Sequence, residues 1–510
     1  MAIPVIDLFA GPGGLGEGFS VLRRENGDAV FKIKLSVEKD QHAHRTLELR
    51  AFFRQFPHGQ APDAYYDYLR GKISREALLA KFPSAAKAAR QEAWWAELGS
   101  GKFPSEKVDE RIRHALGSRE SWVLIGGPPC QAYSVVGRSR VIGREGLAKY
   151  EADPKHRLYR HYLRILAIHR PPVFIMENVK GLLSATVKKQ AIFQQILRDL
   201  ARPLDAVPEA PQGEELSYRL VSLARPAGNL LGQFEPEDYV VRAEEYGVPQ
   251  ARHRVILLGI RESFSGKPAM LQPGKAVAIE RAIGDLPRLR SGLSRADDSG
   301  DMWLEALRPV ARAAWLADSK IDPAVRCALK QVVGEFDGNL GRGAEFVPGR
   351  PAPGFAVRWL RDGRLGGFCN HCSRGHIRED LYRYLFCAVF AQQHGRSPGL
   401  EEFPSGLLPK HENVEQALEG AMFNDRFRVQ LAGRPSTTVV SHIAKDGHYY
   451  IHYDPMQCRS LTVREAARLQ TFPDNYFFEG PRTEQYQQVG NAVPPLLARQ
   501  IAEIVAELLE

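Results

Sequence analysis

Cysteine is scarce in this chain, and long apolar runs, internal repeats and a leader pattern are all missing. Only 6 of its 510 residues are cysteine, which favours free thiols in a reducing compartment over a disulfide framework. No apolar run approaches the roughly 18 residues that a membrane span needs. Residues 1–7 lack a basic region ahead of an apolar one, so we expect no secretory signal and a cytoplasmic location.

The composition is that of an ordinary soluble globular protein. It is 44% hydrophobic and 25% charged, and its length allows two or three domains. The formal net charge is +9, which favours an anionic partner, with nucleic acid first among them. Many basic proteins bind no nucleic acid, so the charge alone leaves the partner open.

Apolar strand patterns alternate with helical patterns in the N-terminal half. The helical patterns cover about 15–24 and 158–169, and the expected strands cover 3–9, 33–37, 122–125, 172–176 and 255–260. Strands separated by helices predict an α/β fold with a doubly wound, mostly parallel, Rossmann-like sheet.

This alternation predicts three parts of the chain. Residues 1–261 form a first domain with a helical insertion at about 52–118, which includes helices at 74–79 and 85–98. Residues 262–435 have no clear strand–helix rhythm and form a second domain. Residues 436–510 return to the first domain through a capping box at Thr462–Glu465, a turn at 488–495 and a final helix at 494–509.

A cysteine follows the buried strand pattern at 122–125. In Gly127-Pro128-Pro129-Cys130, two prolines stiffen the turn and present Cys130 at the carboxyl end of the strand. Open α/β sheets build their sites at that edge, so Cys130 is a candidate nucleophile. The alternative is a buried core cysteine.

A glycine-rich turn follows the first strand pattern. Gly11, Gly13 and Gly16 have dinucleotide-binding spacing, and Glu38 lies at the right distance to meet a ribose hydroxyl. The pattern suits NAD, FAD and S-adenosylmethionine equally, and a tight strand-to-helix turn would also explain it.

Two further motifs carry charge at strand ends. Glu177 directly follows the strand at 172–176, where a raised pKa would make it a proton donor. Arg252 and Arg254 precede the strand at 255–260, and alternation sends both to the same side. The alternatives are a helix cap or surface salt bridge for Glu177, and structural ion pairs for the arginines.

Taken in order, these motifs make the chain resemble the DNA (cytosine-5)-methyltransferases of prokaryotic restriction-modification systems. The resemblance spans about 1–50, 119–261 and 432–510. The matching segments are residues 7–19, Glu38, 126–134, 177–179, 250–254, 464–473 and Gly490-Asn491.

The resemblance implies a role for each matching residue. Cys130 would add to cytosine C6, Glu177 would engage the ring N3 and amino group, and Arg252 and Arg254 would hold the base and surround the thiolate. The implied cofactor is S-adenosylmethionine, bound by Phe9, Gly11, Gly13, Gly14, Glu38, Pro128 and Asn491.

The resemblance also implies partners. The substrate would be double-stranded DNA with a flipped cytosine, covered by a basic loop within 135–160 and read by residues 262–435. The arginines that could contact it are Arg358, Arg361, Arg364, Arg374 and Arg378. We expect a nucleoid-associated monomer, with a cognate restriction endonuclease or defence proteins acting separately. The alternatives are an RNA cytosine methyltransferase, a catalytically silent DNA-binding regulator and a nicotinamide-dependent oxidoreductase.

Two features of the sequence are not explained by the resemblance. An acidic residue usually ends its third strand, but the 52–118 insertion hides that strand, and Asp109 is the provisional candidate. Cys369-Asn370-His371-Cys372 resembles a zinc half-site, but no second Cys-x-x-Cys pair exists. We therefore expect no metal site there.

Overall fold

The computed structural model describes most of the chain and divides it into two compact units. It describes residues 1–129, 155–184, 186–187, 190–210, 215–226, 234–294, 297–350, 354–409 and 426–510. The first unit comprises Met1–Pro62, Glu76–Lys275 and Ala492–Glu510, and the second comprises Asp63–Arg75 and Ala276–Asn491. Residues 436–491 therefore belong to the second unit. The C-terminal segment that returns to the first unit is Ala492–Glu510, which is shorter than the predicted segment 436–510.

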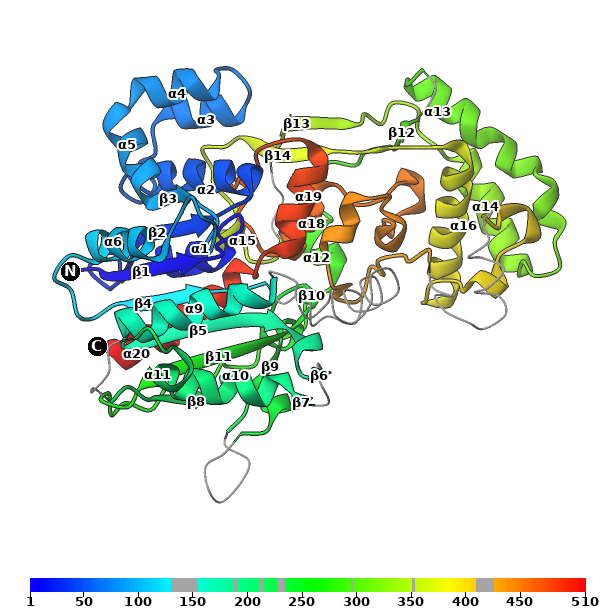
Figure 1. Ribbon diagram of the computed structural model, residues 1–510. Helices are drawn as coiled ribbons and strands as arrows, with labels where there is room; N and C mark the ends of the chain where they lie inside the picture. Colours follow the sequence, from blue (N-terminus) through cyan, green and yellow to red (C-terminus); the bar gives the residue numbers. More distant parts are fainter. Residues whose placement is uncertain are drawn as a thin grey trace. The chain divides into compact units, whose positions relative to one another are not determined.

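The first unit is built on an eight-stranded, mostly parallel sheet (Figure 1). Its strand order is β3-β2-β1-β4-β5-β11-β8, and β9 also pairs with β11. β11 runs antiparallel to its neighbours, whereas β3, β2, β1, β4 and β5 are parallel. The strands are β1 (Ile3–Leu8), β2 (Phe31–Glu38), β3 (Ala93–Trp95), β4 (Val123–Gly126), β5 (Val173–Val179), β8 (Tyr218–Val221), β9 (Val240–Arg242) and β11 (His253–Arg261). This arrangement confirms the predicted fold class.

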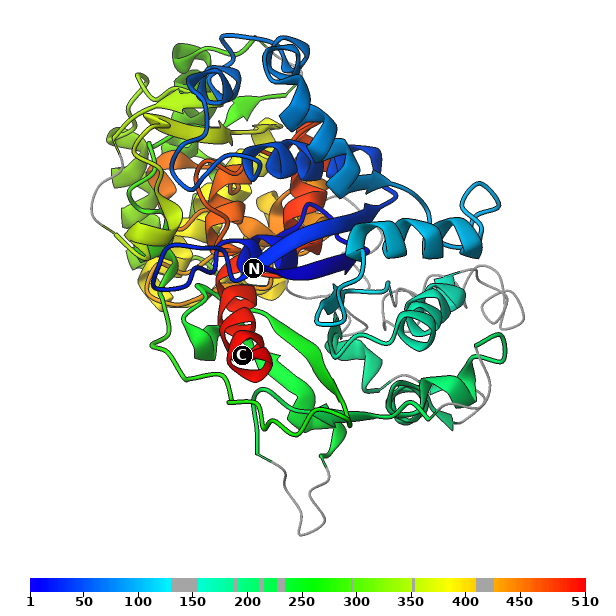
Figure 2. The ribbon, with the colours of Figure 1, turned by 90° about the vertical axis from the view of Figure 1, so that its left-hand side faces the viewer.

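Side chains of the central strands alternate between two cores, one on each face of the sheet. In β4, Leu124 belongs to one core, and Val123 and Ile125 belong to the other. The Leu124 face is covered by α6 (Ser105–Leu116), α9 (Lys155–His169) and α10 (Ile192–Ala201). The opposite face is covered by α1 (Gly14–Ser20) and α20 (Pro495–Leu509), drawn in red in Figure 2. Burial on both faces explains the near-continuous apolar strands.

The 52–118 segment corrects one prediction. It contains four helices, but the helix predicted over 85–98 ends at Glu92, and Ala93–Trp95 form β3 on the free edge of β2. Trp94 packs against the core of the Leu124 face, with its ring 5.3 Å from that of Phe103. This packing and the preference of tryptophan for strands outweigh the helical pattern. The four helices are α3 (Asp63–Leu69), α4 (Arg75–Lys81), α5 (Pro83–Glu92) and α6, and α2 (Gln41–Phe53) precedes them.

The second unit has its own core, and its described strands pair only in two-stranded sheets. Its apolar centre includes Trp303, Leu329, Leu385 and Phe403. The elements are α12 (Ile279–Ile283), β12 (Gly292–Leu293), α13 (Gly300–Leu307), α14 (Pro323–Gly334), β13 (Gly343–Pro348), α15 (Val357–Leu360), β14 (Gly367–Cys372), β15 (Gly375–His376), α16 (Arg378–His394), α18 (Val463–Leu469) and α19 (Arg482–Asn491). Residues 488–491 thus end a helix rather than form the predicted turn.

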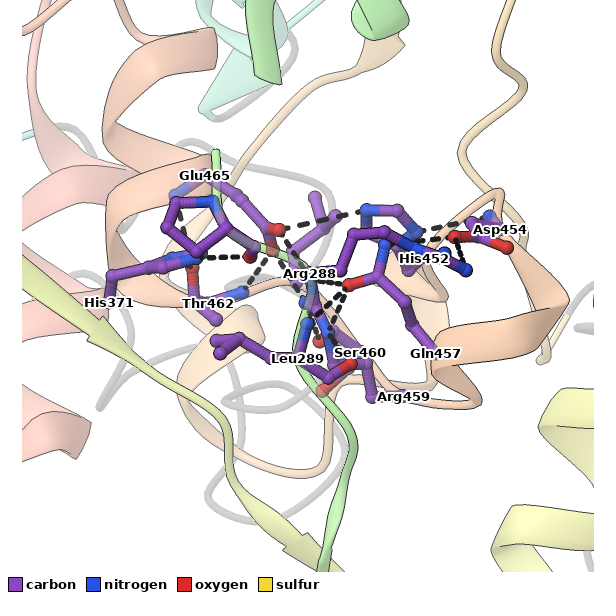
Figure 3. Close-up of polar contacts among 12 residues, drawn as sticks. Arg288, Leu289, His371, His452, Asp454, Gln457, Arg459, Ser460, Thr462 and Glu465 are labelled. Carbon is purple, nitrogen blue, oxygen red and sulfur yellow. Dashed lines mark hydrogen bonds and ion pairs between the residues drawn. The ribbon is translucent and has the colours of Figure 1, made fainter. Parts of the chain in front are cut away.

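A buried polar network organises the chain ahead of α18 (Figure 3). The predicted capping box is present, because Thr462 N donates to Glu465 Oε2 at 2.7 Å and Glu465 N donates to Thr462 Oγ1 at 3.2 Å. The same carboxylate accepts from Arg459 at 2.7 and 2.6 Å, and both side chains are 1% exposed. The charges are therefore paired and hydrogen-bonded, as burial requires.

Among the helices that the structure describes, none has the length and apolar character needed to cross a membrane.

Candidate active site

The glycine-rich turn leaves β1 through left-handed backbone. Phe9 has a φ of 57°, which ends the strand one residue earlier than predicted, and Gly11 and Gly13 have φ values of 56° and 97°. A Cβ built on Gly11 would meet no atom within 4 Å, so this part of the turn borders open space. Such a turn lets a ligand approach the backbone closely.

Gly14 has a packing role in addition to its predicted one. It begins α1, and a Cβ there would overlap the carbonyl oxygen of Val493, just ahead of α20. The missing side chain therefore allows α1 and the start of α20 to touch. The contact of Gly14 with a cofactor stays a prediction.

Glu38 ties the end of β2 to the glycine-rich turn. Its carboxylate accepts hydrogen bonds from Gly11 N at 2.8 Å, Lys39 N at 2.8 Å and Asp40 N at 2.7 Å. Burial raises the pKa of Glu38, and these N–H groups act in the opposite direction. Glu38 is still partly exposed, so its oxygens can accept further bonds from ribose hydroxyls. The turn and this carboxylate fit an adenosine cofactor.

The acidic residue at the end of the third strand is Glu97 rather than Asp109. Glu97 follows β3 and lies 3.1 Å from Lys39 Nζ, and both side chains are about half exposed. Asp109 lies on α6, where its carboxylate accepts from Arg164 at 2.9 and 2.6 Å and contacts His169 Nε2 at 2.9 Å. Asp109 therefore links helices α6 and α9. The tryptophan pair at 94–95 is the sequence signal for the strand that Glu97 follows.

Cys130 lies outside the described residues, but the turn that leads to it is described. Gly126 of β4 pairs with Met176 of β5, so the next residue of each strand lies at the same edge of the sheet. A Cβ built on Gly127 would lie 3.0 Å from Glu177 Oε2, and Pro128 O accepts from Asn178 Nδ2 at 3.0 Å. The start of the Pro-Cys turn is thus held against the end of β5.

Glu177 pairs with Arg254 because β5 and β11 run in opposite directions. The antiparallel register places Ile256 opposite Glu177 and Arg254 opposite Val179, so the start of β11 meets the end of β5. Arg254 Nε lies 3.0 Å from Glu177 Oε1, and the side chains are 12% and 13% exposed. Burial lowers the pKa of Arg254 and the carboxylate raises it, but arginine stays charged in proteins.

Arg252 is more deeply buried than Arg254. Its residue is 2% exposed, and its carbonyl accepts from Ala243 N at 3.0 Å. It lies between β10 (Gln250–Ala251) and β11, at a break in the strand pattern. Its predicted contact with the base stays a prediction.

The remaining predicted residues belong to the second unit or to undescribed segments. Asn491 is exposed and ends α19, and its contact with the cofactor stays a prediction. Arg374 is 8% exposed, donates to Ile443 O at 2.5 Å and stacks on Tyr486, which makes it a structural residue. Arg358 is exposed, and its contact with DNA stays a prediction. Most of the basic loop at 135–160 lies outside the described residues.

The Cys369–Cys372 segment forms the end of β14. Burial raises the pKa of the Cys369 thiol to about 12, so it is protonated at neutral pH. The ring nitrogens of His371 contact Thr462 Oγ1 at 3.0 Å and Pro287 O at 2.9 Å. Over the described ranges, no three His, Cys, Asp or Glu side chains gather as a metal would require.

Comparison with known proteins gives the same family as the motifs. The family model for C-5 cytosine-specific DNA methylase matches residues 91–202 and 398–507. A Type II methyltransferase of Bacillus paralicheniformis, M.Bpa9945I, is 32% identical, with 99% of each chain covered. The DNA (cytosine-5-)-methyltransferase M.ApeKI of Aeropyrum pernix is 28% identical over 78% of this chain and 83% of its own. The Type II methyltransferase M.DdeI of Desulfomicrobium norvegicum is 23% identical over 99% and 89%.

The match to M.Bpa9945I runs over nearly the whole of both chains, so it includes both compact units. The described motifs occupy the ends of β1, β2, β4 and β5 and the start of β11. The chain therefore belongs to the C-5 cytosine-specific DNA methylase family and is a DNA (cytosine-5-)-methyltransferase.

Proposed function

We propose that the chain transfers the methyl group of S-adenosylmethionine to carbon 5 of a cytosine flipped out of a specific duplex DNA sequence, through a transient bond to Cys130. The observation that carries this proposal is the Glu177–Arg254 pair beside the turn that leads to Cys130. A nucleophile, a proton donor and a fixed positive charge are the three groups that activation of a cytosine requires.

The cofactor would lie along the carboxyl ends of β1, β2 and β3. Phe9, Gly11 and Gly13 would border it from the turn, and Glu38 would accept from its ribose hydroxyls. When bound, S-adenosylmethionine supplies an electrophilic methyl group on a sulfonium. Pro128 and Asn491 are further proposed contacts.

Cytosine carbon 5 is a weak nucleophile, and the side chains of the site would increase its nucleophilicity. The Cys130 thiolate forms a bond to C6 while a proton from Glu177 reaches N3, which makes carbon 5 electron-rich. Carbon 5 then bonds to the methyl group, whose bond to the sulfonium breaks to leave S-adenosylhomocysteine. Carbon 5 loses its proton to a base, the C6–sulfur bond breaks to release Cys130, and N3 returns its proton to Glu177. Arg252 and Arg254 would favour the thiolate, because nearby cations lower the pKa of a cysteine.

The DNA would be bound by basic residues and opened at one nucleotide. A cytosine in a duplex is out of reach of a side chain, so the base must leave the stack. The second unit would read the surrounding bases in the major groove. We further propose that the protein is a monomer of the nucleoid and that its methylation protects DNA from a separate cognate endonuclease.

Trapping the covalent bond tests this function. Duplex DNA with 5-fluorocytosine at the target holds the adduct, because fluorine cannot leave as a proton does. We expect a complex that survives denaturing electrophoresis with the wild-type protein and none with Cys130→Ala, whereas Cys327→Ala, at an exposed cysteine, should form it normally.

The target sequence is found first by methylation-sensitive sequencing of DNA from cells that express the protein. An adduct that persists in Cys130→Ala would contradict the role of Cys130. Labelling of transfer RNA without labelling of duplex DNA would favour the RNA alternative, and no methylation of any substrate would favour the regulator.

A further inference from the structure

Part of the helical insertion, Asp63–Arg75, belongs to the second compact unit, although the rest of that unit lies much later in sequence. This segment contains α3, whose tyrosine hydroxyls donate hydrogen bonds within the unit. Tyr65 donates to Asn475 O at 3.4 Å, and Tyr68 donates to Glu479 Oε1 at 2.6 Å. An N-terminal segment is therefore anchored in the unit that the proposed function assigns to reading DNA.

Tyr66 of α3 holds an arginine-rich turn at residues 361–366. Its hydroxyl donates to Asp362 Oδ2 at 2.6 Å, and burial together with this carboxylate raises the pKa of Tyr66, so the hydroxyl keeps its proton. Asp362 also accepts from Asn475 Nδ2 at 2.7 Å and from Arg364 N at 3.0 Å. The only carboxylate of the turn is thus engaged in bonds that fix the turn on α3.

Arg70 holds the backbone of the same turn. Its Nε donates to Leu365 O at 3.2 Å, and its Nη2 donates to Arg364 O. At the tip, Gly363 is exposed, and a Cβ built there would meet no atom of the described chain within 4 Å. The turn therefore has a fixed base and a tip that no described residue covers.

Arg364 is the charge that this turn presents to solvent. Its side chain is 37% exposed, and it pairs at 2.7 Å with Asp63, which is 92% exposed. A surface ion pair of this kind contributes little, so a phosphate can replace the carboxylate. The Arg364 guanidinium also lies 4.6 Å from the centroid of the Tyr66 ring. Stacking on an aromatic face orients the planar guanidinium, which favours bidentate contact with a phosphate.

We propose that Tyr66 is a positioning residue for DNA binding, which holds the turn 361–366 so that Arg364 binds a phosphate of the duplex. Residues 63–75 of the insertion would thereby support the DNA-binding surface of the second unit. The inference rests on the proposed function, because the chain must bind duplex DNA. A phosphate contact carries no sequence information, so its loss should weaken binding to target and non-target duplexes alike.

Fluorescence anisotropy with labelled duplex DNA tests the phosphate contact. Arg364→Ala should weaken binding about tenfold at about 50 mM salt, and it should lower the slope of log Kd against log salt concentration by about one. The matched control is Arg396→Ala in the same unit. Arg396 is also exposed, pairs with Glu402 and lies 5.2 Å from the centroid of the Phe390 ring, and its loss should leave the slope unchanged.

A double-mutant cycle tests the role of Tyr66. Tyr66→Leu removes the ring beside Arg364 and should weaken DNA binding about threefold or more, whereas Tyr66→Phe keeps the ring and should lose less. If Tyr66 acts through Arg364, Tyr66→Leu should cause no further loss in the Arg364→Ala protein. A merely structural role would lower the affinity equally in both backgrounds.

Arg364→Ala changes an exposed side chain, so it keeps the inference falsifiable even where Tyr66→Leu does not fold. A wild-type salt slope in Arg364→Ala, or equal losses from Tyr66→Leu in both backgrounds, would overturn the inference while leaving the function intact. A wild-type protein that binds no duplex DNA would instead defeat the proposed function, and this inference with it.

Discussion

At the scale of single residues, Glu177 and Arg254 form the most informative pair in the first unit. Both side chains are nearly buried and separated by 3.0 Å, where a low effective dielectric strengthens their attraction. The start of the Pro-Cys turn also touches Glu177. In the proposed mechanism, this carboxyl group, which lies beside the turn that leads to Cys130, donates the proton to the base.

Glu177→Gln should lower the rate of DNA methylation by about 100-fold or more, the lower end of what a positioned proton donor contributes. The amide cannot donate the proton at N3 in the same way, and it removes the charge opposite Arg254. Single-turnover transfer of labelled methyl groups measures this. Glu244→Gln is the control, because Glu244 pairs with His253 at 2.7 Å. A Glu177→Gln rate within threefold of wild type would contradict the assignment.

Asp7 is a buried carboxyl next to the glycine-rich turn. Burial raises its pKa to about 8, so at neutral pH the folded protein holds a proton that the unfolded chain has released. Between the unfolded and folded pKa values, stability therefore falls as pH rises, and above the folded pKa it no longer changes through this group.

Asp7→Asn should remove this dependence. The wild-type free energy of unfolding, relative to that of the variant, should fall by up to about 1.4 kcal/mol per pH unit between pH 5 and 8 and then level off. Urea denaturation at several pH values measures this, with the exposed Asp28→Asn as control. If the free energy of unfolding changes with pH in the same way for wild type and Asp7→Asn, the raised pKa of Asp7 would be refuted.

At the scale of elements, close helix packing joins the two ends of the first unit. A Cβ on Gly18 of α1 would lie 2.5 Å from the Ala498 side chain and from Arg499 N of α20. The contact places the chain's last helix on the helix that follows the glycine-rich turn. The position of that turn thus depends on residues almost 500 positions later in sequence.

Gly18→Ala should therefore cost about 1–3 kcal/mol of stability, as overpacking of a core does. The added methyl group meets backbone as well as side chain, so a rotamer change alone cannot relieve it. Chemical denaturation measures the cost. Gly101→Ala, where a Cβ would meet nothing within 4 Å, should be neutral, and equal stability of both variants would argue against the packing.

The structure at the start of α18 is stabilised by one buried carboxylate, that of Glu465. Glu465→Gln would leave the Arg459 guanidinium, 1% exposed, without the opposite charge that it pairs with. Breaking a buried pair from one side costs about 3–5 kcal/mol. We expect a lower unfolding midpoint and earlier proteolysis within the second unit, whereas Glu484→Gln on α19 should behave as wild type. Unchanged protease resistance would contradict this role of the network.

At the scale of the whole molecule, the chain combines a net charge of +9 with two compact units. A cationic protein gains DNA affinity by releasing counterions, and this gain shrinks as salt is added. Cofactor binding lacks that contribution, so the two affinities should respond differently to ionic strength.

Raising salt from about 50 to about 200 mM should weaken duplex DNA binding by at least tenfold and change the Kd of S-adenosylhomocysteine by less than twofold. Fluorescence anisotropy of labelled DNA and a titration with S-adenosylhomocysteine measure the two effects. DNA affinity that is insensitive to salt would mean that the basic residues do not contact phosphates.

The sequence alone determined the central strands, the capping box at Thr462–Glu465 and the final helix, because each depends on local periodicity or on residues close in sequence. It also determined the order of motifs that carries the family. Only the tertiary structure decided that Trp94 and Trp95 form a strand, since that choice depends on the free edge of β2 and on core contacts with distant residues. For the same reason, only the structure showed that Glu97, and not Asp109, is the acidic residue at the end of the third strand. The pairing of Glu177 with Arg254 likewise depends on an antiparallel register that no local pattern encodes.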